Sequence, residues 1–184
     1  MLPARIIWSD PVTVYQGQAV RRAAELRLDR LRRHHGNYRW VDEELSNLRQ
    51  TFGWLSRQAD EHSLECMVEY VRLLAPYLHQ RSLEADLLAW SEPALSAAMF
   101  LNQNVDWLLL ERCQSQRALG RWTDAMATAQ AVRRAGAQTD PGARARASLL
   151  LGQLQFNCGA YREALTMLAE AEALLAEVGD EAGV

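Results

Sequence analysis

Two short segments of the chain share a pattern that marks the reversal between two α-helices. Residues 120–125 and 159–164 both read Gly, any residue, an aromatic residue, two residues of any type, and Ala. Glycine is favoured where a helix ends and the chain turns back, because it adopts positive φ without a Cβ penalty. The small Ala allows two helix backbones to approach closely. The repeated pattern therefore predicts a stack of antiparallel helical hairpins.

Apolar residues recur at steps of three and four from residue 16 onward, and turn residues interrupt them at regular intervals. This period predicts an all-α fold of about eight helices, joined by short turns and paired as four antiparallel hairpins. We expect Asp42 to cap the second helix and Pro93 to kink or split the fourth. The predicted helices span residues 16–35, 42–58, 60–79, 83–98, 104–119, 121–135, 141–158 and 162–178.

The C-terminal hairpin carries further residues at fixed distances from its turn glycine. Leu151-Gly152 lies in its first helix, and a small–large–small stripe follows in its second, at Ala164, Leu168 and Ala171. Together with the turn, these residues resemble the tetratricopeptide repeat. The preceding hairpin keeps the turn pattern but has Arg112-Cys113 in place of Leu-Gly, and its turn lies 39 residues earlier (120 to 159). The resemblance implies hairpins stacked as a right-handed superhelix.

The N-terminal half is more divergent. It contains two segments similar to those that open the helical region of STAND-type bacterial signalling ATPases and related regulators. The first segment matches at Glu44, Asn47, Leu48, Arg49 and Trp54, and the second at Leu74, Pro76, Arg81, Trp90, Ala94 and Leu95, with Ser82 in place of a glycine. This resemblance implies a sensing array within a larger regulator. We expect an irregular N-terminal arm (1–15), a degenerate hairpin region (16–98) and repeats resembling tetratricopeptide repeats (99–184) that continue beyond the chain end.

Composition excludes several chemistries. All 20 basic residues are arginine, so the chain has no lysine for a phosphate-binding P-loop or for a Schiff base. No nucleophile or zinc motif is present, and His62 and Cys66 supply only two possible metal ligands four residues apart. We therefore expect no catalytic residue, no cofactor and no metal, and predict that the chain is not an enzyme.

The cellular location is predicted from what the sequence lacks. Three widely spaced cysteines do not form a disulfide framework, and no apolar run approaches the roughly 20 residues of a membrane helix. The N-terminus also lacks the features of a signal peptide. These observations predict a cytoplasmic protein.

The tetratricopeptide resemblance implies that the first helices of the hairpins line a concave groove. We expect this groove to bind a protein or peptide, or another domain of the same parent protein. Its predicted residues are Asn104, Trp107 and Glu111 in the fifth helix and Arg144, Ser148 and Gln155 in the seventh. One alternative is a small-molecule effector sensor of a transcriptional regulator, with an apolar pocket lined by tryptophans.

Charge is distributed unevenly along the chain. Seven arginines lie between residues 21 and 39 against Glu25 and Asp29, whereas residues 163–184 contain six acids and no base. The basic helix could contact nucleic acid through Arg21, Arg22, Arg30 and Arg33, with Tyr38 and Trp40 stacking on bases. The net charge of −3 favours a solvated or protein-facing surface instead. Opposite charges at the two ends also suggest head-to-tail self-association.

Overall fold

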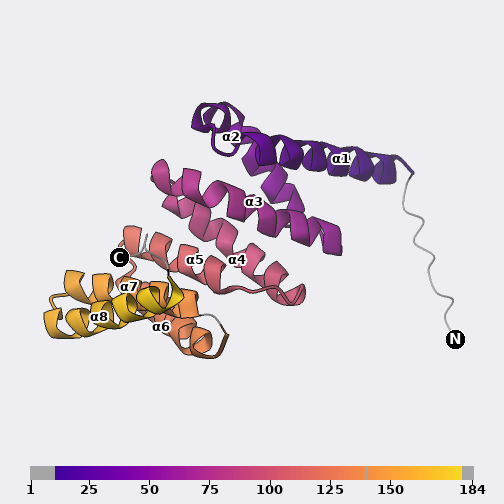
Figure 1. Cartoon of the computed structure of the whole chain (residues 1–184). Helices are drawn as coiled ribbons and strands as arrows, with labels where there is room; N and C mark the ends of the chain where they lie inside the picture. The colour runs from indigo at the N-terminus through magenta and orange to yellow at the C-terminus, as the bar shows by residue number, and fades with distance from the viewer. Residues whose placement is uncertain (1–10, 140, 180–184) are drawn as a thin grey trace, which may run out of the picture.

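The computed structural model describes residues 11–139 and 141–179, and within these ranges the regular structure is entirely α-helical. The predicted all-α fold of about eight helices is therefore confirmed, while the right-handed sense of a superhelix stays a prediction. The helices are α1 (Pro11–His34), α2 (Tyr38–Leu55), α3 (Glu61–Gln80), α4 (Glu84–Phe100), α5 (Asp106–Ala118), α6 (Trp122–Thr139), α7 (Pro141–Asn157) and α8 (Tyr161–Val178) (Figure 1). None of them is long and apolar enough to cross a membrane.

The helices pack mainly on their neighbours in sequence. Each helix contacts the next one along the chain, and α1 also contacts α3, α3 contacts α5, and α5 contacts α7. The odd-numbered helices therefore follow one another along one side of the array. Helices α1 and α8 lie at its opposite ends (Figure 1).

Four turns share one backbone geometry. The residue after the helix cap has positive φ at Ser82 (55°), Asn102 (53°), Gly120 (72°) and Gly159 (79°). In each turn the following N–H donates to a carbonyl five residues earlier, for example from Arg121 to Gln116 at 2.8 Å. This is the Schellman arrangement, which satisfies carbonyls at the helix end. The degenerate second hairpin thus turns like the repeats, with Ser82 in the left-handed conformation in place of glycine.

Two expectations about helix boundaries are corrected. Helix α1 begins at Pro11, so residues 11–15 are helical and not part of an irregular arm, while residues 1–10 lie outside the described ranges. Helix α2 begins four residues before Asp42 because the Asn37 side chain caps it, accepting from the Trp40 N–H at 3.3 Å. Helix α4 continues through Pro93, so it is not split there, and the kink stays a prediction.

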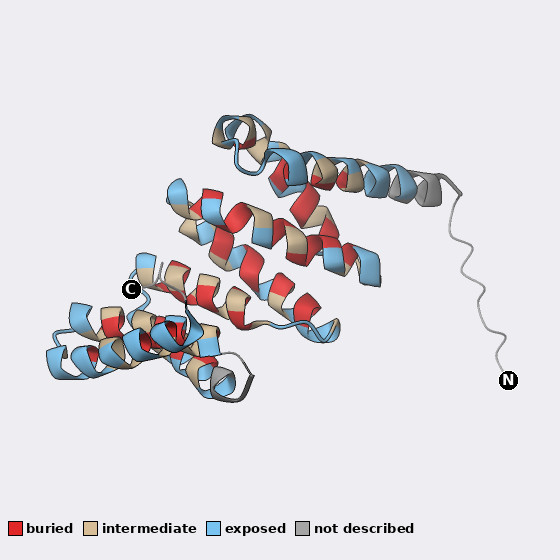
Figure 2. Ribbon diagram, viewed as in Figure 1, coloured by how far each residue is buried: buried red, intermediate tan, exposed pale blue. Residues whose placement is uncertain are grey.

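The core is a series of side-chain clusters between successive helices. The largest joins α1, α2, α3, α4 and the start of α5, and it contains the fully buried Tyr70 and Tyr77. Two smaller clusters continue from α5 to α7, one of them around Cys113 and Leu154 and the other around Val132 and Ala147. Figure 2 shows buried residues on the sides where helices face one another and exposed residues on their outer sides.

The closest helix approach in the last hairpin depends on Gly152. A Cβ at this position would lie 2.7 Å from Cγ of Leu168 and 3.2 Å from the carbonyl oxygen of Ala164. We predict that Gly152→Ala lowers the free energy of unfolding by about 1–3 kcal/mol, because the added methyl forces α7 and α8 apart. Urea denaturation followed by circular dichroism would measure this change.

Gly53 provides the matched control, because it lies within α2 and a Cβ there would meet no atom within 4 Å. Gly53→Ala should raise the free energy of unfolding by about 0.5–1 kcal/mol, since Ala loses less backbone entropy in a helix. A Gly152→Ala protein as stable as the parent would contradict the close packing described here.

Candidate partner-binding groove

A hollow lies between α5 and α7 on the side of the odd-numbered helices. Its volume is about 300 Å³. Trp107, Glu111 and Arg117 line it from α5, and Arg146, Leu149 and Gln153 line it from α7, together with Leu110, Gln114 and Leu150. Apolar side chains thus form part of the wall, with charged and amide groups around them. Such a surface fits a chain segment that carries both kinds of group.

Arg72 connects this hollow to a second one. The Arg72 guanidinium carbon lies 4.6 Å from the centroid of the Trp107 ring, a cation–π contact between α3 and α5. Arg72 also lines a hollow of about 530 Å³, formed by Glu65, Val68 and Glu69 of α3 with Gln103 and Asn104 of the α4–α5 turn. The two hollows therefore meet at the Arg72–Trp107 pair along the odd-numbered helices. We refer to them together as the odd-helix groove.

Two buried donors at the α5–α7 hollow lack hydrogen-bond partners among the described residues. They are Nε1 of Trp107 and Nε of Arg117. A buried polar group without a partner costs roughly 1–3 kcal/mol. Both residues line the hollow, but the two nitrogen atoms are themselves covered, so an acceptor in the hollow reaches them only when a neighbouring side chain moves. They are the unsatisfied donors next to the groove.

His79 anchors the groove residue Glu111. Its Nδ1 lies 3.0 Å from a Glu84 oxygen and its Nε2 lies 2.6 Å from a Glu111 oxygen. The hydrogen bond to Glu111 raises the pKa of His79 above its ordinary value, with a further contribution from Glu84 and against the effect of burial. Ser115 donates to the other Glu84 oxygen at 2.9 Å. As an imidazolium, His79 thus joins α3, α4 and α5.

Two of the three residues predicted in the fifth helix lie in α5, whereas Asn104 precedes it in the α4–α5 turn. Trp107 and Glu111 line the α5–α7 hollow, and Asn104 lines the adjoining one. The side-chain Oδ1 of Asn104 also accepts from the Asp106 N–H at 2.9 Å, which satisfies a donor at the start of α5. All three belong to the odd-helix groove, and their role in binding stays a prediction.

The three predicted residues of α7 do not line this hollow. At 100° per residue, Arg144, Ser148 and Gln155 lie about half a turn away from Arg146, Leu149 and Gln153. Arg144 donates to Glu170 of α8 at 2.8 Å, and Ser148 is fully buried. Polarity suggested exposure at these positions, but Arg144 pairs with α8, and Ser148 Oγ is buried with no hydrogen-bond partner among the described residues.

Gln155 shows why the prediction for α7 was wrong. It stands four residues before the turn glycine, as Gln116 does in the preceding hairpin, where Thr128 donates to the Gln116 side chain at 2.9 Å. Met167 occupies the position equivalent to Thr128 and has no hydroxyl. The side-chain Oε1 of Gln155 is therefore buried with no partner in the described structure.

The sequence analysis missed the α7 residues that do line the hollow. Arg146 and Gln153 are seven residues apart, with Leu149 and Leu150 between them, and this spacing places all four on one helix face. That spacing could have identified the α7 residues from the sequence. No sequence spacing could have identified Arg72, because its stacking on Trp107 joins two separate hairpins.

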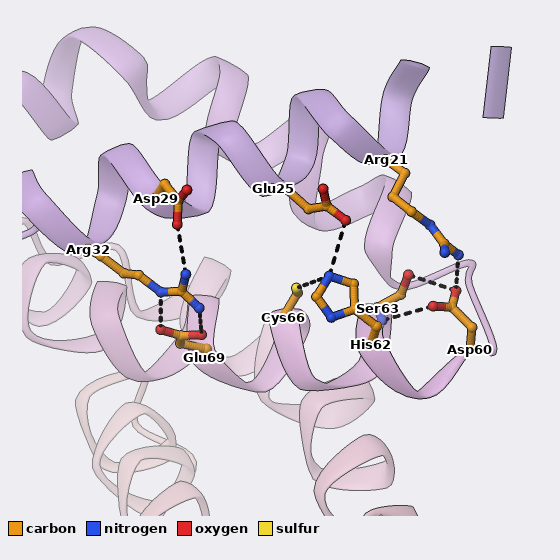
Figure 3. Close-up of polar contacts among 9 residues, drawn as sticks. All are labelled: Arg21, Glu25, Asp29, Arg32, Asp60, His62, Ser63, Cys66 and Glu69. Atoms are coloured by element: carbon orange, nitrogen blue, oxygen red, sulfur yellow. Dashed lines mark hydrogen bonds and ion pairs between the residues drawn. The ribbon is translucent and has the colours of Figure 1, made fainter. Parts of the chain in front are cut away.

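One of the four arginines of the predicted basic face is paired within the chain. Arg21 pairs with Asp60 at 2.8 Å, and the neighbouring Arg32 pairs with Glu69 at 2.7 Å (Figure 3). Arg22, Arg30 and Arg33 are exposed. The aromatic residues proposed for base stacking are half-buried against the core, where Tyr38 meets the Tyr77 ring edge-on at 5.5 Å. This packing removes the stacking platform that a single-stranded nucleic acid requires.

The residues considered for metal or nucleophilic chemistry make ordinary packing contacts. His62 Nε2 lies 3.2 Å from Glu25 and 3.7 Å from Cys66 (Figure 3). The described residues contain no group of three ligands that could hold a metal ion. Burial raises the pKa of the Cys66 and Cys113 thiols to about 11, so neither is a thiolate near neutral pH.

Comparisons with protein-family models, curated proteins and solved structures find no match to this chain. The resemblances to tetratricopeptide repeats and to STAND-type regulators therefore rest on the residues of the chain itself.

His79 should give the protein a pH-dependent stability. The folded state raises the pKa of His79, so protonation of His79 stabilises the folded protein. This contribution to the free energy of unfolding is complete below the ordinary pKa of 6.5, and it is lost as the pH rises through the pKa of His79 in the folded state. We predict that the free energy of unfolding falls across this window and that His79→Gln flattens the profile. Urea denaturation at a series of pH values would measure both effects.

The exposed His35 on the same chain provides a control. His35→Gln should retain the decline in stability with rising pH. If the parent and His79→Gln proteins gave superimposable profiles, His79 would not be the titrating group.

Proposed function

We propose that this chain is a non-catalytic helical-repeat segment that binds an extended protein or peptide segment in the odd-helix groove. The proposal rests on one observation above all, the buried and unpartnered Nε1 of Trp107 and Nε of Arg117 at the α5–α7 hollow. An extended segment offers a backbone carbonyl at every residue, so it supplies acceptors at short intervals. It also carries side chains that would cover Leu149 and Leu150.

The charge around Trp107 favours acceptors and acidic groups. Arg72 stacks on its ring, and Arg117 and Arg146 line the same hollow. Glu111 is the acidic residue of that hollow, and His79 is hydrogen-bonded to it. The balance leaves an excess of positive charge, which attracts an acidic partner segment more than a basic one.

The wider role follows from the sequence resemblances and is equally a proposal. An array resembling tetratricopeptide repeats in a cytoplasmic STAND-type regulator would sense a partner or another domain of its parent protein. The odd-helix groove is the surface through which it would do so.

Selection of a random-peptide phage library on the immobilised full chain tests the proposal. Enriched sequences would be synthesised with a fluorescent label, and their affinity measured by fluorescence anisotropy. We predict that Trp107→Phe weakens binding about 3- to 10-fold, because it keeps the ring but removes a hydrogen bond of about 0.5–1.5 kcal/mol. Trp122→Phe is the matched control, since Trp122 is partly exposed and lies outside the hollow.

Two outcomes would contradict the proposed function. One is a selection that enriches no binding peptide. The other is equal affinity of the parent, Trp107→Phe and Trp122→Phe proteins for the enriched peptides. A screen in which small molecules raise the melting temperature of the parent but not of Trp107→Phe, with no peptide enriched, would support the effector-sensor alternative.

A further inference from the structure

We propose that this chain associates with a second copy of itself end to end, with the outer face of α1 in one copy against the outer face of α8 in the other. This contact uses the two ends of the array and is separate from the odd-helix groove. Its elements are an exposed apolar patch, exposed acidic residues of α8, and a basic stripe at the opposite end.

The apolar patch lies at the α7–α8 end. Phe156, Tyr161 and Leu165 are exposed by 58%, 60% and 69%, and the rings of Phe156 and Tyr161 meet edge-on at 5.3 Å. Large apolar side chains exposed together in this way mark an interaction surface. We call these three residues the tail patch.

The repeat itself shows what kind of element covers such a patch. Met126 of α6 is six residues after its turn glycine, as Leu165 of α8 is after Gly159. Met126 is partly buried, and it packs against the cluster that contains Leu151 and Leu154 of α7. Helices α2 and α4 likewise contact the odd-numbered helix that follows them, α3 and α5. The even-numbered α8 therefore suits an odd-numbered helix as the element that covers the tail patch.

The exposed surface of α8 carries net negative charge. Glu163, Glu172 and Glu177 are exposed there, against the exposed Arg162 next to Tyr161. Glu170 differs, because Arg133 and Arg144 bind it within the same copy. The α8 surface thus combines apolar side chains with net negative charge.

Helix α1 presents the complementary surface at the other end of the array (Figure 1). Arg22, Leu26, Arg30 and Arg33 recur at steps of three and four, so they share one face of α1. All four are exposed, and Leu26 is exposed by 65%. The opposite side of the helix carries the buried Ala24, Leu28 and Leu31. We call the exposed residues the head stripe.

The two surfaces match in charge and in apolar content. Leu26 stands one turn from arginines on either side, and it can cover Leu165 while the arginines reach the α8 carboxylates. Such a contact joins two different surfaces, so each added copy leaves one head stripe and one tail patch open. The association is therefore open-ended, and it weakens as salt screens the charges.

Sedimentation velocity of the full chain tests the proposal. At about 20 mM NaCl the average mass should rise with protein concentration from about 1 µM to about 1 mM, and about 500 mM NaCl should reverse the rise. A head variant (Arg22→Glu, Arg30→Glu, Arg33→Glu) and a tail variant (Glu163→Arg, Glu172→Arg, Glu177→Arg) should each associate at least about tenfold more weakly. Circular dichroism would verify that both variants keep their helix content.

The decisive measurement mixes two singly blocked proteins. Combining Arg30→Glu with Leu165→Glu leaves one open head and one open tail in the mixture, and the two blocked surfaces repel each other, so the mixture should form pairs and no larger species. A protein with Arg57→Glu, Arg121→Glu and Arg134→Glu is the charge-matched control, because these exposed arginines lie outside the head stripe. It should associate like the parent.

Several outcomes would overturn the proposal. A parent protein that stays monomeric at low salt over the whole concentration range would do so, as would a control that loses association as the head variant does. If random-sequence duplex DNA bound the parent tightly, the head variant failed to bind it, and both proteins had the same oligomeric state, the head stripe would be a nucleic-acid surface instead.

Discussion

The backbone reversal repeated at Ser82, Asn102, Gly120 and Gly159 determines how this array is built. In each of these four turns one residue in the left-handed conformation ends the helix and directs the next one back, and the hydrogen bond closed behind it satisfies a carbonyl of the preceding helix. The directions of α4, α5, α6 and α8 follow from these turns. The positions that face one another, such as Gly152 and Leu168, are then set by their distance from the turn.

The sequence predicts the parts of the fold that depend on local chemistry. Helical periodicity and turn residues gave the number of helices and their approximate limits, because both act within a few residues. The start of α2 was misplaced because Asn37 and Asp42 are both acceptable caps. The structure uses Asp42 for a contact across hairpins, in which Tyr77 and Arg81 donate to its carboxylate at 2.7 and 3.0 Å.

The candidate groove was predictable only in part. The α5 positions followed from the repeat register, whereas the α7 positions required knowledge of which polar side chains find partners between helices. Arg144 meets Glu170 from another helix, and Ser148 is small enough to be buried. Similarly, ion pairs between α1 and α3 use Arg21 and Arg32, so a count of arginines overstates the positive charge that remains exposed. Pairings between distant segments are not encoded in local periodicity.

The packing of each helix on its near neighbours in sequence has a mechanical consequence. Among the described helices α1 packs on α2 and α3 and not on α8, so a force applied at one end is borne first by the contacts of the terminal hairpin. The small clusters of the C-terminal hairpins bury fewer side chains than the cluster that joins α1 to α5. We therefore expect a stretching force to release the C-terminal hairpins before the N-terminal helices separate.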